Sequence, residues 1–267
     1  MAKKKIAILG GGNLGVAIAK GLRKPALSAQ YDVIVTRRNV QALEPLKDLA
    51  IAVSNNNKES VKESDLIILA VQPKQLNGLL EEIKPVLNSK QHTVISVITG
   101  IEISDITKTL GEEIRVIRAM PNTAIAIGQS MTCIASANAS SDVLDEIKTI
   151  FDAMGKAMII DERLMQAATV LGACGIAFFL RFIRAASQGG TEVGFHAEEA
   201  QVIASQTALG AASLLLETNQ HPEDAIDKVT TPQGCTIAGL NEMEHHGLSS
   251  ALIKGIVASY KKIEKIV

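Results

Sequence analysis

Three glycines directly after a short apolar run constrain the fold of this chain more than any other feature. Residues 6–9 read Ile-Ala-Ile-Leu, and Gly10, Gly12 and Gly15 follow with the spacing G-x-G-x-x-G. The first glycine permits a tight turn, the second lets a ligand approach the backbone, and the third lets a helix pack on the strand. This pattern predicts a strand, a turn and then a helix that ends at about residue 22.

Short apolar runs alternate with helical patterns through the first part of the chain. Further strands are expected at residues 33–36, 66–71, 93–98, 114–118, 128–135 and 157–160. Helices are expected at residues 57–63 and 142–154, the second with Gly155 as its C-cap. Strands that alternate with helices predict an α/β domain over residues 1–160, built on a doubly wound, mostly parallel Rossmann-type sheet.

The pattern changes after residue 160, where no strand is predicted. Long helices are expected at 161–189, 197–217 and 248–266, with shorter ones at 221–229 and 236–244. Residues 167–180 and 208–216 are apolar on nearly every face, and such a helix must be surrounded. Because so short a segment cannot easily surround both, residues 161–267 are predicted to form an all-α dimerisation and substrate domain. The expected assembly is a homodimer through these helices, or a higher oligomer of dimers.

Composition argues against several kinds of partner. The net charge is −1, which leaves no basic surface for a nucleic-acid backbone. The longest apolar stretch, residues 167–180, is shorter than the roughly 20 residues that a membrane span needs and is interpreted as a buried helix. The apolar run 6–9 is too short for a signal peptide. Three separated cysteines and five histidines without ligand spacing indicate neither disulfides nor a bound metal, which fits a cytoplasmic protein.

The context of the glycine loop points to a dinucleotide. The loop follows a predicted strand and opens a helix, whose free N–H groups suit phosphates. The next strand ends in Thr36, Arg37 and Arg38, with no acidic residue after it. An NAD site usually has an acidic residue there, whereas guanidinium groups suit a 2′-phosphate. The cofactor is therefore predicted to be NADPH, with NADH as the alternative; a turn without ligand and solvated arginines are the competing interpretations.

A segment near the C-terminus resembles a family signature. Residues 229–244 read VTTPQGCTIAGLNEME, which is similar to the signature of pyrroline-5-carboxylate reductases, the last enzymes of proline synthesis. Residues 57–59 (NKE), 70–73 (AVQP) and 118–123 (RAMPNT) also resemble stretches of that family, and the resemblance runs in order from about residue 6 to residue 266. It implies hydride transfer from NADPH to the imine carbon of 1-pyrroline-5-carboxylate, which gives proline.

Motif and resemblance together predict the site. The predicted cofactor-binding residues are Gly10, Gly12, Asn13, Leu14, Gly15, Thr36, Arg37, Arg38, Asn57, Ala70, Val71, Gln72 and Pro73. The predicted substrate-binding residues are Glu162, Thr231, Gly234, Cys235 and Thr236. Thr236 is the predicted catalytic residue, and free N–H groups at the helix start after Gly234 suit a substrate carboxylate. The alternatives are a plain turn with Thr236 as N-cap, and an exposed Glu162 favoured by the helix dipole.

Three positions depart from the family's usual pattern. Gln72 stands where the family usually has Lys, Gln233 stands where it has Gly, and residues 172–176 read GACGI in place of SGSGP. Because of these departures, a weakly catalytic NADP-binding protein remains an alternative interpretation. A related imine reductase, or a β-hydroxyacid dehydrogenase of similar architecture, is a further alternative. The latter enzymes use a helix-borne Lys, and this chain has no Lys between Asp161 and Asp227, which favours imine reduction.

Overall fold

The computed structural model describes residues 3–263 and contains two compact units. The first comprises the described residues up to Cys174 together with residues 260–263, and the second comprises Gly175–Ser259. This division is one of spatial compactness. The domain boundary expected between residues 160 and 161 remains a prediction.

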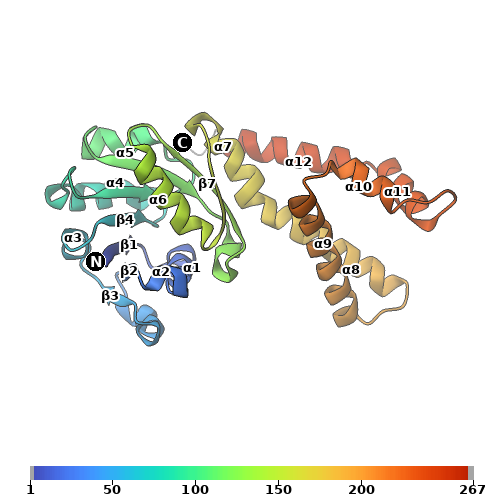
Figure 1. The fold of residues 1–267 in the computed structure, drawn as a ribbon, viewed down its shortest axis with the longest axis horizontal. Coiled ribbons are helices and arrows are strands. Elements are labelled where there is room, and N and C mark those ends of the chain that lie inside the picture. The colour runs from blue at the N-terminus through green and yellow to red at the C-terminus, as the bar shows by residue number, and fades with distance from the viewer. Residues whose placement is uncertain (1–2, 264–267) are drawn as a thin grey trace. The chain divides into compact units, whose positions relative to one another are not determined.

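A mostly parallel sheet forms the centre of the first unit (Figure 1). Its strands are β1 (Lys4–Leu9), β2 (Tyr31–Thr36), β3 (Ala52–Ser54), β4 (Leu66–Leu69), β5 (Thr93–Ser96), β6 (Arg115–Met120), β7 (Ser130–Ser136) and β8 (Gly155–Ile159). They lie in the order β3-β2-β1-β4-β5-β6-β7-β8, and only the β6–β7 pair is antiparallel. The connection of residues 121–129 between these two strands is too short for the crossover that a parallel pair needs. The predicted fold class is confirmed.

Helices cover both faces of this sheet. They are α1 (Asn13–Gly21), α2 (Pro25–Ser28), α3 (Asn57–Lys62), α4 (Pro73–Ile83), α5 (Ile103–Leu110), α6 (Ser141–Asp152) and α7 (Met165–Ala168), with 3-10 turns at Val40–Leu49, Lys84–Val86, Thr123–Ile127 and Glu162–Leu164. A hydrophobic core lies on each face of the sheet, and alternate residues of β1 point into one or the other. Ile6 and Ile8 pack with α1 and α6, whereas Ala7 and Leu9 pack with α3, α4 and α5. Strands with apolar residues on both sides are typical of a sheet that is covered twice.

Two features of this unit differ from the sequence prediction. Strand β3 was not expected; it is three residues long, too short for a periodic pattern. Gly155 does not cap α6, whose C-cap is Ala153. Gly155 instead opens β8 with φ +149°, and a Cβ atom there would lie 2.0 Å from the carbonyl oxygen of Ser130 on β7. This glycine is needed for the close pairing of two strands.

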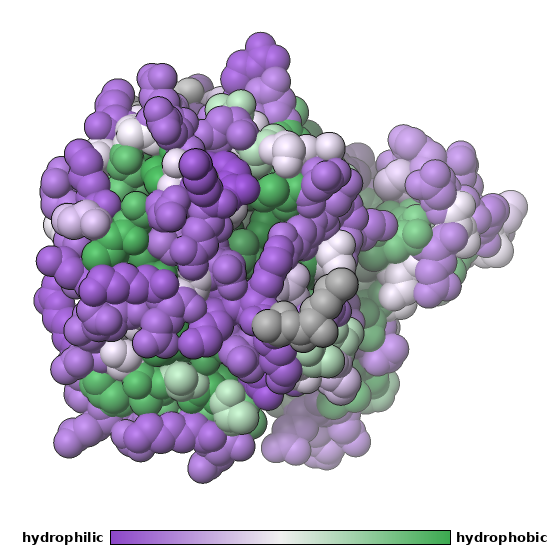
Figure 2. Space-filling model, turned by 60° about the vertical axis from the view of Figure 1, so that its left-hand side comes forward, coloured by the Kyte–Doolittle hydropathy of each residue, from purple (hydrophilic) through white to green (hydrophobic). Residues whose placement is uncertain are grey.

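The second unit is helical. Its helices are α8 (Gly175–Glu192), α9 (Ala197–Thr218), α10 (Pro222–Lys228), α11 (Cys235–His245) and α12 (Leu248–Ile263), the last of which continues into the first unit. Within the described residues no strand follows Ile159, as predicted. Helices α8 and α9 form an antiparallel pair whose large apolar side chains are mostly exposed in a single chain, among them Phe179, Leu209 and Leu216. By contrast, hydrophilic side chains cover much of the first unit's surface on the face drawn in Figure 2.

The helical stretch Glu162–Glu192 contains the apolar residues 167–180, which were predicted to be covered by a partner subunit. Its apolar window is 17% buried in the single chain, so the chain alone does not bury residues 167–180. Among the described residues this stretch of 31 residues is also the one helix long and apolar enough, by length and composition, to cross a membrane. The same length and composition occur in helices that pack against a second subunit.

Candidate active site

The three glycines of the loop each have a separate geometric role. Gly10 has φ +119°, and a Cβ atom there would lie 2.3 Å from the carbonyl oxygen of Ala70. A Cβ atom on Gly15 would lie 2.1 Å from the carbonyl oxygen of Gly10, so the first turn of α1 packs directly on the loop. A Cβ atom on Gly12 would meet nothing within 4 Å. The backbone at Gly12 is therefore open on the side where a ligand would approach.

The loop lies where the order of the sheet changes direction. From β1 the chain turns to β2 and β3 on one side, and then crosses to β4 on the other side. Ligands of open α/β sheets bind at this switch point, outside the carboxyl ends of the strands. Gly12 is the N-cap of α1, so the first N–H groups of that helix point toward this region without partners inside the helix. A pyrophosphate fits such a cradle.

A hollow of about 800 Å³ opens over these strand ends. Of the predicted cofactor residues, those that line it are Gly10, Gly12, Thr36, Arg37, Arg38, Asn57, Ala70, Val71 and Gln72. Asn13, Leu14, Gly15 and Pro73 lie directly beside it, in the first turns of α1 and α4. The first unit thus brings together residues that are up to about 60 positions apart in the sequence. A hollow of this size is typical of small-molecule sites.

One face of α4 also borders the hollow and was not predicted from the sequence. Lys74, Gln75, Gly78, Leu79 and Glu82 line it, and their spacing of three or four residues corresponds to one side of a helix. Lys74 supplies a cation beside Gln72, the position at which the family usually has Lys. That lysine was predictable, because it follows the end of a strand next to the switch point. Glu82 was not predictable, because it lies two helical turns further along α4 from the end of the strand.

Two of the charged residues at the hollow differ in how they are held. The guanidinium Nη1 of Arg37 donates to the carbonyl oxygen of Gly11 at 3.1 Å, which fixes it beside the glycine loop. The neighbouring Arg38 is exposed at the rim. Thr36, in contrast, lies at the wall of the hollow with only 2% of its surface exposed, and its hydroxyl donates to Asn57 Oδ1 at 2.6 Å. The arginines are therefore the donors at this end of the hollow.

Glu162 is not the exposed first-turn carboxylate that one alternative proposed. Its Oε1 atom accepts from the Ile103 N–H at 2.8 Å and from Arg118 Nη1 at 3.1 Å. The Arg118 side chain is 7% exposed and that of Glu162 is 30% exposed. Asp161, beside it, forms a different kind of pair: hydrogen bonds from the exposed Arg163 lower the pKa of the Asp161 carboxyl to about 2. Arg118 was not predicted, although it lies in the RAMPNT segment.

The divergent segment at residues 172–176 remains helical. Thr169–Cys174 form a π-helical segment that leads into α8. The Gly172 carbonyl oxygen accepts from Asn122 Nδ2 at 3.0 Å, so the RAMPNT segment is hydrogen-bonded to the widened turn. Single π turns inside α-helices are frequent at functional sites, and here the widening exposes a carbonyl to a side-chain donor.

The predicted substrate turn has a defined geometry in the second unit. Gly234 N–H donates to the Thr231 carbonyl oxygen at 3.0 Å, with Pro232 and Gln233 at the central positions. Gln233 has φ +60°, the left-handed conformation that a type II turn requires at its third residue. Glycine adopts it freely, which explains the family's usual residue there.

Helix α11 begins directly after this turn, at Cys235, with Gly234 as its N-cap. The alternative that Thr236 is the N-cap is therefore wrong, since Thr236 is the second residue of the helix. Thr231 and Thr236 flank a helix start whose first N–H groups have no partner inside the helix. Thr231, Gly234, Cys235 and Thr236 belong to the second unit, whereas Glu162 and the cofactor residues belong to the first.

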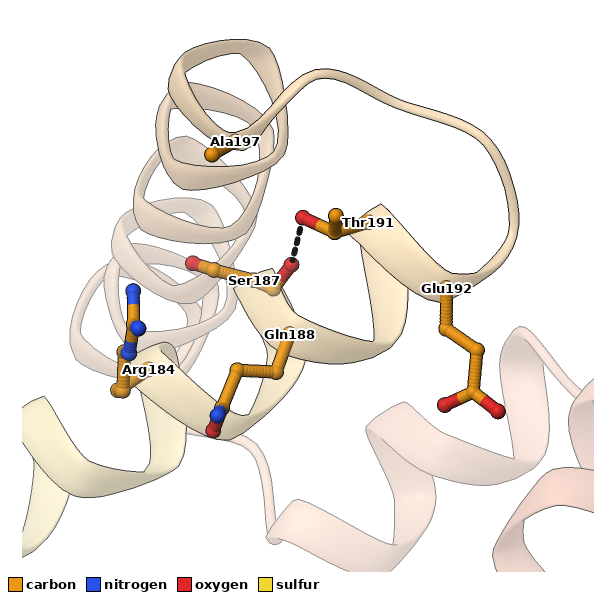
Figure 3. Close-up of a pocket in the computed structure, with 6 residues that line it drawn as sticks. All are labelled: Arg184, Ser187, Gln188, Thr191, Glu192 and Ala197. Atoms are coloured by element: carbon orange, nitrogen blue, oxygen red, sulfur yellow. Dashed lines mark hydrogen bonds between the residues drawn. The ribbon is translucent and has the colours of Figure 1, made fainter.

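A further hollow lies within the second unit, between α8 and α9 (Figure 3). Its lining residues are Arg184, Ser187, Gln188, Thr191, Glu192 and Ala197. The Thr191 hydroxyl donates to the Ser187 carbonyl oxygen at 3.1 Å, so part of its polar lining is already satisfied by the helix. None of the predicted site residues lines it.

The doubly wound sheet and the glycine loop at its switch point define a Rossmann-type dinucleotide-binding protein. Residues 5–100 match the family model described as "NADP oxidoreductase coenzyme F420-dependent". Residues 162–266 match the model described as "Pyrroline-5-carboxylate reductase dimerisation".

Relatives extend these matches over the whole chain. Pyrroline-5-carboxylate reductase 1 of Dictyostelium discoideum is 51% identical over 269 residues, which are 96% of this chain and 49% of that protein, so the chain spans about half of that relative's length. Pyrroline-5-carboxylate reductase 2 of the same organism is 45% identical over 98% of this chain and 93% of its own length. A solved pyrroline-5-carboxylate reductase from Coxiella burnetii has a TM-score of 0.91 at 26% identity, covering 99% of this chain and 98% of that one. The chain belongs to the pyrroline-5-carboxylate reductase family.

Proposed function

We propose that the chain reduces 1-pyrroline-5-carboxylate to L-proline with NADPH. The observation that most strongly supports this reaction is the open backbone at Gly12, where no atom blocks the approach of a pyrophosphate. Arg37 and Arg38 line the same hollow. The reaction itself is inferred from relatives named pyrroline-5-carboxylate reductase, which match nearly the whole chain. The proposed assembly is a homodimer, or a larger oligomer of dimers, in the cytoplasm.

In this proposal the first unit holds the dinucleotide. The α1 N–H groups bind the pyrophosphate, Arg37 and Arg38 take the 2′-phosphate, and Lys74 adds a positive charge to the lining beside Gln72. Bound NADPH supplies the hydride. The imine carbon receives it, and its nitrogen carries the proton that makes the C=N bond electrophilic. Because a protonated imine needs no strong acid, the protein mainly orients the two reactants, which can supply roughly 7–11 kcal/mol.

The second unit binds the substrate in this proposal. The Cys235 and Thr236 N–H groups hold the carboxylate at the start of α11, and the Thr231 and Thr236 hydroxyls bond to the substrate. Glycine is needed at position 234, since a Cβ atom there would lie 2.5 Å from Thr231 Oγ1, the hydroxyl proposed to bond to the substrate. The family resemblance also assigns Glu162, which pairs with Arg118, to substrate binding.

The test is turnover of the imine with NADPH. It is measured from the loss of nicotinamide absorbance and from the amount of proline formed. We expect turnover of the imine with either NADPH or NADH, and a larger kcat/KM with NADPH than with NADH. Replacing Arg37 and Arg38 together should erode that preference, because each charge-assisted contact contributes about 1.5–3 kcal/mol. Equal or better values with NADH would contradict the cofactor preference. Tight NADPH binding without turnover would instead favour the weakly catalytic binding protein, which the GACGI segment keeps as the second candidate.

A further inference from the structure

A chain of three side chains crosses the floor of the dinucleotide hollow. The Thr36 hydroxyl, at the end of β2, donates to Asn57 Oδ1 at 2.6 Å. Asn57, the first residue of α3, donates from Nδ2 to Glu82 Oε2 at 3.1 Å. All three residues line the hollow, and Glu82 lies in the last turn of α4. Elements that are far apart in the sequence are therefore coupled at the ligand-facing surface.

The carboxylate at one end determines the direction of every proton in this chain. An ionised carboxylate only accepts hydrogen bonds, so Asn57 must turn its NH₂ group toward Glu82. Its carbonyl oxygen then faces Thr36, and Thr36 has to be the donor. The single hydroxyl proton of Thr36 is used in this bond, and Thr36 presents only lone pairs to the hollow.

This arrangement disfavours an additional phosphate at the same place. A 2′-phosphate is an acceptor of hydrogen bonds, and Thr36 cannot donate to it while it donates to Asn57. Glu82 adds a negative charge to the lining of the hollow that Arg37 and Arg38 make attractive for anions. The strand end has no acidic residue, but the fold supplies one from α4.

We propose that Glu82 is a specificity-determining residue, which orients Asn57 and Thr36 and thereby limits the preference for NADPH over NADH. The inference rests on the proposed function, in which this hollow takes the dinucleotide. Glu82 acts through its two neighbours and is a positioning residue. Glutamine at the same position can accept from Asn57 or donate to it, so the bound phosphate can select the reversed chain, in which Thr36 donates to the ligand.

The experiment measures the dissociation constants of NADPH and NADH by fluorescence titration. The variant is Glu82→Gln, and the matched control is Glu81→Gln, which removes an equal charge from the exposed neighbouring position of α4 that does not line the hollow. In Glu82→Gln the affinity ratio of NADPH to NADH should rise about 10-fold, as for one recovered hydrogen bond to a charged group. In Glu81→Gln the ratio should stay within about twofold.

A second background tests the route of the effect. In a Thr36→Val chain the hydroxyl is absent, so adding Glu82→Gln should no longer raise the ratio, apart from the part that charge removal alone explains. An unchanged ratio in Glu82→Gln, an equal rise in Glu81→Gln, or a full rise in the Thr36→Val background would each overturn the inference. If the unaltered chain binds neither dinucleotide, the proposed function fails as well, which distinguishes the two failures. Melting temperatures show whether each variant is folded.

Discussion

The same type of residue has opposite environments in the two units. Leu9 and Leu69 in the first unit are 0% exposed, whereas Leu209 and Leu216 in the second are 58% and 72% exposed. The first unit closes its core within one chain, because helices cover both faces of the sheet. The helices of the second unit have no second layer within one chain, and a domain needs at least two packed layers. The chain therefore carries one self-sufficient core and one that a second copy completes, in agreement with its match to a dimerisation family.

The largest expected effect would break this comparison. Leu209→Glu with Leu216→Glu puts charges on the apolar surface of α9 and should dissociate the dimer. An unpaired charge in an interface costs about 3–5 kcal/mol, so the dimer dissociation constant should rise by at least about 100-fold. Light scattering during dilution measures it. Leu49→Glu is the matched control, since Leu49 is an exposed leucine of the first unit. A double variant that stays dimeric, or a control that dissociates equally, would contradict the comparison.

A smaller effect is expected inside the first unit. Glu162→Ala leaves the buried Arg118 guanidinium and the Ile103 N–H without their acceptor. The free energy of unfolding should fall by about 2–3 kcal/mol, less than for a fully buried pair because Glu162 is partly exposed. Chemical denaturation of the assembled protein measures the change. Asp161→Asn is the control: asparagine still caps the helix, and the lost pair with Arg163 is exposed, so little change is expected. Equal losses of unfolding free energy in Glu162→Ala and Asp161→Asn would show that the Glu162–Arg118 pair contributes no more than the exposed pair.

Thr236→Val sharpens the division of labour between the units. Valine keeps the branched shape and the backbone N–H but removes the hydroxyl. We expect kcat/KM for the imine to fall about 10–100-fold while NADPH binding is unchanged, as for one lost hydrogen bond to a charged partner. Because Gly234 is the N-cap, stability should hardly change. Thr230→Val is a matched control, since its hydroxyl bonds to the Ile226 carbonyl oxygen at 2.7 Å. An active but destabilised Thr236→Val protein would rule out the substrate role.

The smallest expected effect compares backbone strain in the two units. Gln233 has φ +60° in the second unit and Ala50 has φ +54° in the first. Replacing either by glycine relieves the left-handed strain but gives the unfolded chain more freedom, so each should gain at most about 1 kcal/mol. Thermal melting measures both. A clear loss of stability in Gln233→Gly alone would show that the glutamine side chain itself supports the turn.

Much of the fold was predictable because its signals are local. Every strand except β3 was expected from a short stretch rich in apolar residues. The glycine loop was predicted with its separate roles at Gly10, Gly12 and Gly15, since each role follows from spacing along the chain. The turn at residues 231–234 was predicted as well, from Pro232 and Gly234. The C-cap at Gly155 was wrong because a glycine after a helix is ambiguous: the close pairing of β8 with β7 uses it instead.

The sequence by itself determined the class of fold, the dinucleotide loop and the apolar helices that need a partner. Each of these is written in a period or a spacing of a few residues. The tertiary structure alone decided that Arg118 pairs with Glu162 and that Glu82 reaches Asn57. These pairs join separate elements, and their approach depends on sheet order, register and helix packing. No local pattern encodes such distances, because they are set by how all the elements pack together.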